Sequence, residues 1–86
     1  MPNANYVKGR RKEYKVVKQL KEHGFDIAQR SAGSHSPVDI FAIDKINRRI
    51  VLVQCKPSSM AKTRRNKILE ENKELNGRFE VKFIVL

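Results

Sequence analysis

Two strand-forming runs joined by a short polar turn lie within residues 37–56, which read PVDIFAIDKINRRIVLVQCK. Val, Ile and Phe dominate both runs, and these residue types favour strands. If residues 45–48 form the loop of a hairpin, one antiparallel register follows. That register pairs Ile43 with Ile50 and Phe41 with Leu52.

Three polar side chains gather at the open end of this hairpin. The register places Asp39 opposite Gln54, and because side chains alternate along a strand, Lys56 lies on the same face. The prediction depends on the register, since a slip of one residue would move each side chain to the other face. Both faces are otherwise apolar, so we expect helices or a second subunit to cover them.

Residues 6–23 predict a helix that ends before Gly24. At about 100° per residue, its apolar side chains gather on one arc, and Glu13 falls in the middle of that arc. The apolar arc contains Tyr6, Tyr14, Val16, Val17 and Leu20. The spacing of the two tyrosines predicts core positions. An acid on a buried face needs a metal ion or a charge partner, for which Arg10 is the alternative.

The whole chain predicts a loose tail at residues 1–5 and one domain at residues 6–86. The further expected elements are a strand at 25–30, strands at 37–43 and 49–56, a helix from a cap at Ser58 or Ser59 to about residue 75, and a last strand at 79–86. The order α-β-β-β-α-β indicates an α/β domain in which helices pack against a mixed sheet.

Composition favours a polyanionic partner. The 86 residues carry 19 Lys and Arg against 9 Asp and Glu, a net charge of +10, and nucleic acid is the natural ligand of such a chain. The sequence has no long apolar run and no basic helix with bulky apolar anchors, which argues against a membrane partner. With no secretory signal, the cytoplasm is expected. The single cysteine excludes an internal disulfide and a structural zinc site.

The polar groups at the open end of the hairpin suit phosphodiester hydrolysis, in which a divalent cation activates water and relieves charge. Magnesium, or manganese in its place, prefers oxygen ligands and keeps several waters. The candidate ligands are Asp39 first, then Glu13 directly or through water, the Gln54 side-chain oxygen and the backbone carbonyl of Cys55. Lys56 would stabilise charge on the scissile phosphate. The alternative is that Asp39 and Lys56 are ordinary strand-end residues.

Two basic runs lie close in sequence to these residues and are expected to contact DNA phosphates. The candidates are Lys8, Arg10, Arg11 and Lys12 in the first run, and Lys62, Arg64 and Arg65 in the second. A charge run is also typical of a solvated face. No pattern for reading bases is present, so recognition is expected to be by shape and backbone.

Ordered short motifs between residues 8 and 57 resemble the PD-(D/E)xK nuclease superfamily, and within it the archaeal Holliday junction resolvases. The matching stretches are Lys8-Gly9-Arg10 with Glu13, His23-Gly24-Phe25, Arg30-Ser31-Ala32-Gly33-Ser34, Val38-Asp39-Ile40 and Val53-Gln54-Cys55-Lys56. The resemblance implies a minimal restriction-endonuclease-like core and a dimeric, magnesium-dependent endonuclease that nicks four-way junctions in DNA recombination and repair. It makes Glu13, Asp39 and Lys56 catalytic. It also implies that Arg10, Arg30 and Ser34 position the phosphate.

One departure from the resolvase pattern affects the proposed metal site. The pattern has glutamate where this chain has Gln54, and the amide removes one negative charge. Glutamine occurs there in Mrr-like restriction enzymes, so an Mrr-like nuclease acting on duplex DNA is a second hypothesis. A non-catalytic DNA-binding module that keeps the nuclease fold is a third. A homodimer is expected because two helices are too few to cover both sheet faces, and a symmetric dimer suits a two-fold junction.

Overall fold

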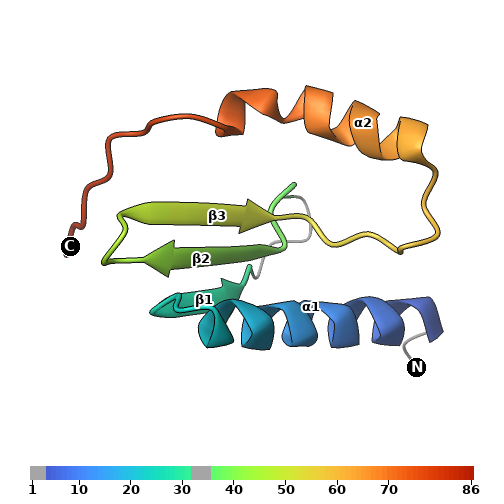
Figure 1. Cartoon of the computed structure of the whole chain (residues 1–86), viewed down its shortest axis with the longest axis horizontal. Helices are drawn as coiled ribbons and strands as arrows, with labels where there is room; N and C mark the ends of the chain where they lie inside the picture. The colour runs from blue at the N-terminus through green and yellow to red at the C-terminus, as the bar shows by residue number, and fades with distance from the viewer. Residues whose placement is uncertain (1–3, 32–35) are drawn as a thin grey trace.

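The computed structural model describes residues 4–31 and 36–86, except for the side chains of residues 4–8. The chain begins with helix α1 (Ala4–Glu22) and continues through three strands to helix α2 (Lys62–Glu71) and the short 3-10 helix η1 (Lys73–Leu75). The strands are β1 (Ile27–Arg30), β2 (Ile40–Asp44) and β3 (Arg49–Val53). Helices α1 and α2 lie on opposite sides of the sheet (Figure 1).

The sheet has the order β1-β2-β3, and both strand pairs are antiparallel. In the β2–β3 hairpin, Phe41 pairs with Leu52 and Ile43 pairs with Ile50. The register predicted from the sequence is therefore confirmed. Because β1 pairs Arg30 with Ile40, Arg30 shares a sheet face with the most buried side chain of the core.

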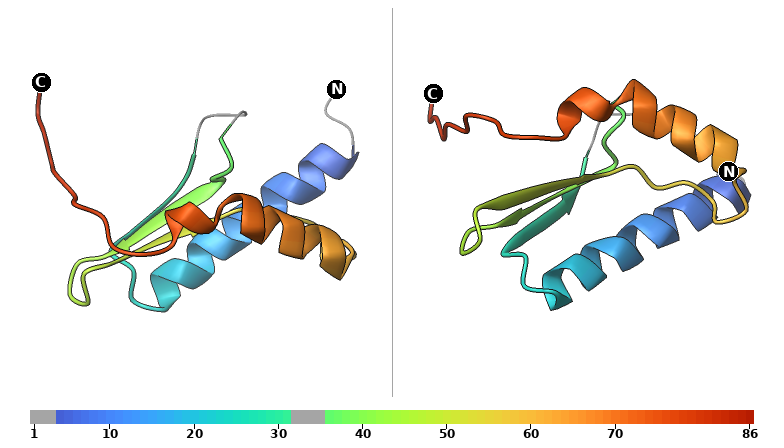
Figure 2. Two further views of the ribbon diagram at one scale, coloured as in Figure 1. Left: turned by 90° about the horizontal axis from the view of Figure 1, so that it is seen from above. Right: turned by 45° about the horizontal axis from the view of Figure 1, so that its top comes forward.

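Helix α1 covers one face of the sheet, as two further views show (Figure 2). Buried Phe25, Ala28 and Ala42 form the core there, and Val17 and Leu20 of α1 pack against them. The two alanines are small, which allows the helix backbone to approach the strands closely. The predicted helical phase of Val17 and Leu20 is confirmed.

Gly24 ends α1 and sets the direction in which the chain enters the sheet. Its φ is +96°, a left-handed conformation that costs glycine little. Gly24 N–H donates to Lys21 O at 3.2 Å, and Phe25 N–H donates to Leu20 O at 3.2 Å. This pair of hydrogen bonds is the Schellman arrangement, and it turns the Phe25 ring into the core.

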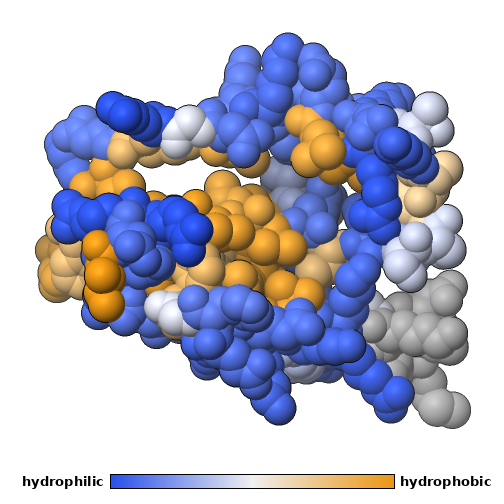
Figure 3. All heavy atoms as spheres, viewed as in Figure 1, coloured by the Kyte–Doolittle hydropathy of each residue, from blue (hydrophilic) through white to orange (hydrophobic). Residues whose placement is uncertain are grey.

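Helix α2 stands apart from the sheet. No Cα atom of α2 lies within 8 Å of any Cα atom of the described strands. A groove of about 990 Å³ separates α2 from β3. Its apolar lining includes Ile50, Leu52, Ile68, Leu69, Leu75 and Phe79. Figure 3 shows these apolar colours gathered in the hollow between α2 and the sheet. The second sheet face is thus left largely open.

The predicted strand at 79–86 is wrong, and with it the prediction of a mixed sheet. The segment has no regular structure and runs past the β2–β3 turn (Figure 1), with Phe83 94% exposed. Strand propensity alone does not hold a strand, because its backbone groups need a partner. The described fold is a small α+β domain with a three-stranded antiparallel sheet.

Two predicted boundaries also differ from the structure. The helix cap expected at Ser58 or Ser59 is wrong, because Met60 N–H donates to Pro57 O at 3.0 Å and encloses both serines in a turn. Helix α2 instead follows Ala61, which makes no side-chain cap. The expected helix start at residue 6 is also too late, since α1 already includes Ala4 and the next residue. Residues 1–3 lie outside the described part of the chain.

The β2–β3 turn is organised by a buried carboxylate. Asp44 is 3% exposed, accepts the N–H of Asn47 at 3.2 Å and the Asn47 side-chain amide at 2.7 Å, and lies 3.7 Å from the Arg49 guanidinium. The Asn47 side-chain hydrogen bond is the main cause that lowers the pKa of Asp44, and the Asn47 N–H and the Arg49 charge add to it.

We predict that this turn makes stability depend on acid pH. A carboxyl group whose pKa is lower in the folded state stabilises the fold above its unfolded pKa of about 3.9, and that contribution is lost as pH falls through the folded pKa. Urea unfolding should therefore show wild type more stable than Asp44→Asn at pH 6, with the gap shrinking below pH 3. Glu71→Gln, on exposed α2, is the control. A gap that stays constant with pH would contradict the prediction.

Candidate active site

Asp39 is fixed where the open ends of all three strands meet. Its backbone N–H donates to Val53 O at 2.8 Å, and its backbone O accepts from Ser31 N–H at 2.7 Å. Its carboxylate Oδ2 accepts the N–H of Cys55 at 2.8 Å. Hydrogen bonds to a carboxylate are stronger than neutral ones. Asp39 thus joins the end of β1 to the segment after β3.

Glu13 of α1 forms an ion pair across the helix–sheet interface. Its Oε2 accepts a hydrogen bond from Arg30 Nε at 3.0 Å and forms an ion pair with Arg30 Nη2, also at 3.0 Å. The side chains are 18% and 29% exposed, so desolvation is partial. Arg30 faces α1 because it pairs with Ile40 on the covered face of the sheet. The charge partner of Glu13 is therefore Arg30, and the predicted alternative, Arg10, is not.

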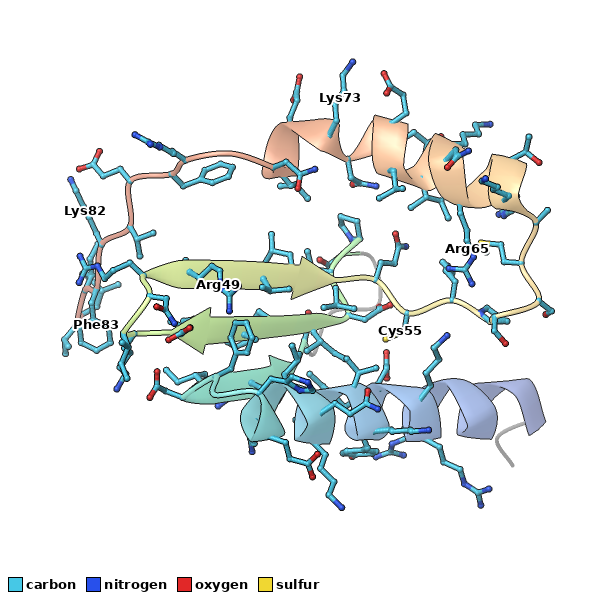
Figure 4. The ribbon with its side chains drawn as sticks, viewed as in Figure 1. Arg49, Cys55, Arg65, Lys73, Lys82 and Phe83 are labelled. Carbon is cyan, nitrogen blue, oxygen red and sulfur yellow. The ribbon has the colours of Figure 1, made fainter. Side chains whose placement is uncertain are left out.

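Cys55 follows β3 and lies beside Asp39, whose carboxylate accepts its backbone N–H. Figure 4 shows its sulfur between the end of β3 and α1. Burial is the largest cause that raises the pKa of the Cys55 thiol, the charges of Asp39 and then Glu13 raise it further, and the charge of Lys12 lowers it. The thiol is therefore a common reporter for the charges of the two candidate carboxylates, which are 26 positions apart in the sequence.

The predicted strand at 49–56 is too long, because β3 ends at Val53 and Gln54 and Lys56 lie in the segment after it. Both line the groove that faces α2, together with Arg65. The Lys56 backbone O accepts a hydrogen bond from Lys12 Nζ, and the Pro57 O accepts one from Arg65 Nη2 at 2.5 Å. The groove lining therefore includes Gln54 and Lys56 but not Asp39, with which they were predicted to share a face, while Glu13 is held by Arg30 at the α1–β1 interface.

The predicted DNA-binding residues fall into two groups. Arg10 and Arg11 on α1, and Lys62 and Arg64 on α2, are exposed. Lys12, Arg30 and Arg65 are instead engaged with protein groups. The prediction of Ser34 as a phosphate contact and the side chain of Lys8 lie outside the described part of the chain.

The sequence pattern misplaced one aromatic side chain. Tyr14 was expected in the core, yet it is 54% exposed. Its hydroxyl accepts Arg30 Nη1 at 3.2 Å, and its ring faces the Arg10 guanidinium. The i, i+4 spacing of Arg10 and Tyr14 was the available signal, because such pairs are neighbours on a helix.

The oxygen donors at this site suit a hard divalent cation. No three His, Cys, Asp or Glu side chains gather to hold a metal among residues 4–31 and 36–86. Magnesium does not require three, because it keeps several waters and binds one or two carboxylates. Asp39 and Glu13 are two such carboxylates. The residues present therefore fit a water-rich magnesium site better than an all-protein cage.

The family of the chain follows from a comparison with family models. The model of the archaeal Holliday junction resolvases (Hjc) matches residues 4–77. The chain belongs to this family. The match spans α1, the whole sheet, α2 and η1, so it includes every described candidate site residue. No significant match was found among curated proteins or among solved structures.

Membership of the resolvase family implies a nuclease that binds DNA and serves recombination. None of the helices in the described ranges is both long and apolar enough to cross a membrane.

We predict that Cys55 reports on the charges of the site. Glu13→Gln and Asp39→Asn each remove a negative charge that raises the pKa of the thiol, so each should increase the rate of iodoacetamide labelling at pH 8. Lys12→Met should slow it. Because the chain has one cysteine, mass spectrometry of the intact protein measures this rate directly.

Magnesium gives the same measurement a second use. A cation bound at Asp39 and Glu13 would lower the thiol pKa and accelerate labelling, whereas a cation bound elsewhere would not. The acceleration should disappear in Asp39→Asn. If the labelling rate is the same in all three variants as in the wild type, Cys55 does not lie near the two acids.

Proposed function

We propose that this chain is a magnesium-dependent DNA endonuclease that nicks four-way junctions. The observation that carries the proposal is the position of Asp39, whose carboxylate is fixed at the open end of the sheet by the Cys55 N–H at 2.8 Å. The charges of Asp39 and Glu13 both raise the pKa of the Cys55 thiol, which supports a shared site. The resolvase family match supports DNA as the substrate.

Each described residue has a separate task in this proposal. Asp39 and Glu13 would hold the cation with water in its other positions, because Gln54, the other expected oxygen donor, lines the groove that faces α2. When bound, the cation supplies an activated water and relief of charge on the phosphate. Arg30 holds Glu13 in place through a hydrogen bond from Nε and an ion pair with Nη2, both at 3.0 Å. Manganese, which also takes oxygen ligands, would substitute.

Lys56 would approach the scissile phosphate from the groove side. Its backbone is held by Lys12 of α1, so the ammonium group extends from a fixed point. A cation placed where negative charge develops stabilises the transition state more than the ground state. Exposed Arg11, Lys62 and Arg64 would contact the flanking phosphates, which sets binding strength and not sequence preference.

A second candidate function is a DNA-binding module without catalysis. Two observations favour it. Glu13 is already neutralised by Arg30, and Gln54 contributes no negative charge, so the site attracts a cation less strongly than one with three acids. Such a module would bind junctions and leave them intact.

We predict magnesium-dependent nicking of a labelled synthetic four-way junction by the wild type. Asp39→Asn should lower the single-turnover rate by on the order of 10²–10³, since the amide removes the ligand charge. Lys56→Met should lower the rate similarly while changing junction binding little. Linear duplex of the same sequence tests the Mrr-like alternative, which requires cleavage of the duplex as well.

Asp26→Asn is the matched control for this experiment. The Asp26 Oδ2 also accepts a backbone N–H, from Lys45 at 2.8 Å, but it lies at the turn end of the sheet. The Asp26→Asn variant should therefore cleave the junction at the wild-type rate. If Asp39→Asn also cleaves at that rate, the catalytic assignment is lost. Tight junction binding with no cleavage, unchanged in Gln54→Glu, would favour the non-catalytic module.

We also propose that the chain acts as a homodimer through the groove between α2 and β3. Apolar side chains remain exposed there, including Leu69 at 65%, Ile50 at 46% and Leu52 at 42%. Contiguous exposed apolar surface is typical of interaction sites. A symmetric pair would hold two identical sites at a fixed separation, as cleavage of two opposed strands requires.

For this dimer, sedimentation should give twice the 10.0 kDa monomer mass. Leu69→Lys should shift the chain to monomer, because burying a lysine in the interface is costly. Ile46→Lys is the control, since Ile46 is 86% exposed at the β2–β3 turn and away from the groove. A wild type that stays monomeric at high concentration would refute the dimer.

A further inference from the structure

Two arginines from different elements meet on one aromatic ring beside the candidate site. The Tyr14 ring centroid lies 4.8 Å from Cζ of Arg30 and 5.9 Å from Cζ of Arg10. Arg10 comes from the preceding turn of α1 and Arg30 from the end of β1. Tyr14 directly follows Glu13 in the sequence, so the ring lies next to the residue that forms the ion pair with Arg30.

Packing does not account for this tyrosine. Its side chain is 54% exposed, and it is not among the residues that pack on the buried core. This exposed ring contacts two guanidinium groups, and such contacts are electrostatic because the face of an aromatic ring attracts cations. Hydrogen bonding and charge from Arg10, and then from Arg30, lower the pKa of the Tyr14 hydroxyl, which reflects the same positive field.

The two arginines are used differently. Arg30 directs Nε and Nη2 at Glu13 and Nη1 at the Tyr14 hydroxyl, so its hydrogen bonds are taken up in holding the site together. Arg10 is exposed, and among the described side chains no carboxylate lies within 4.0 Å of its guanidinium. Two positive charges beside one Glu13 leave a net positive charge, which favours an anion.

We propose that Tyr14 is a positioning residue that holds Arg10 against its ring, so that the Arg10 guanidinium binds a DNA phosphate next to Glu13. A guanidinium binds the two oxygens of a phosphodiester through paired hydrogen bonds, and orienting it beforehand reduces the entropy lost on binding. The Tyr14 hydroxyl also accepts a hydrogen bond from Arg30 Nη1 at 3.2 Å. This inference rests on the proposed function only in naming DNA as the ligand.

The test is a double-mutant cycle on junction binding in Ca²⁺ without Mg²⁺, with Tyr14→Leu, Arg10→Met and the double variant. Arg10→Met should raise Kd about tenfold and reduce the salt slope by about one. Tyr14→Leu should do nearly the same although it removes no charge. The double variant should be no weaker than either single variant, because coupled residues are not additive.

Tyr14→Phe keeps the ring and removes the hydroxyl. Because the ring that contacts Arg10 remains, it should bind the junction more tightly than Tyr14→Leu does, and it should cleave more slowly in Mg²⁺ because Arg30 loses one hydrogen bond. Gln19→Leu is the matched control, a neutral exposed side chain on the same helix replaced by the same leucine. Circular dichroism checks the folding of each variant, and if Tyr14→Leu is unfolded, Tyr14→His replaces it in the cycle.

Several outcomes would overturn the inference. If the effects of Tyr14→Leu and Arg10→Met add, Tyr14 contacts DNA by itself, as a stacking residue would. If Tyr14→Leu leaves Kd and salt slope unchanged, or if the wild type does not bind the junction, Tyr14 positions nothing. The proposed function fails separately, since coupled binding without Mg²⁺-dependent cleavage would leave Tyr14 as a positioning residue in a non-catalytic module.

Discussion

The arrangement of the site depends on the hydrogen bonds that hold Asp39. Its backbone is bonded to the segments after β1 and at the end of β3, and its carboxylate accepts the Cys55 N–H. Without that acceptor, the segment that carries Gln54 and Lys56 would leave the sheet in another direction. The β2–β3 register fixes Asp39 in turn, so the position of one carboxylate follows from the pairing of apolar residues well away from it.

Charge balance at the helix–sheet interface follows the same logic. A partly buried Glu13 is costly unless its charge is compensated, and Arg30 on the covered face of the sheet compensates it. The partner is set by strand register and not by proximity in sequence. This explains why Arg10, which is only three positions from Glu13, contacts the Tyr14 ring instead.

Local periodicity predicted the parts of the fold that depend on nearest neighbours. Alternation in 37–56 gave the hairpin register, and the 3.6-residue period placed Val17, Leu20 and Glu13 toward the sheet. Local periodicity gave wrong predictions where a residue's structure depends on a partner that is distant in the sequence. Residues 79–86 have strand composition but no strand beside them, and Tyr14 has a core-like spacing but is drawn outward by two cations. Lys12 carries no sequence signal for its bond to Lys56 O, because that contact arises only when α1 crosses the end of β3.

The bonds made by Lys12 and Arg65 have a consequence for how the charge of the chain should be counted. One bond reaches from α1 and the other from α2, and each directs a cation at a backbone carbonyl, that of Lys56 or of Pro57. Neutral carbonyls compensate no charge, so the formal charge of +10 is unchanged, but two of the cations that produce it are directed at the protein. The positive charge that an approaching polyanion meets first therefore comes from exposed side chains such as Arg11 and Lys62.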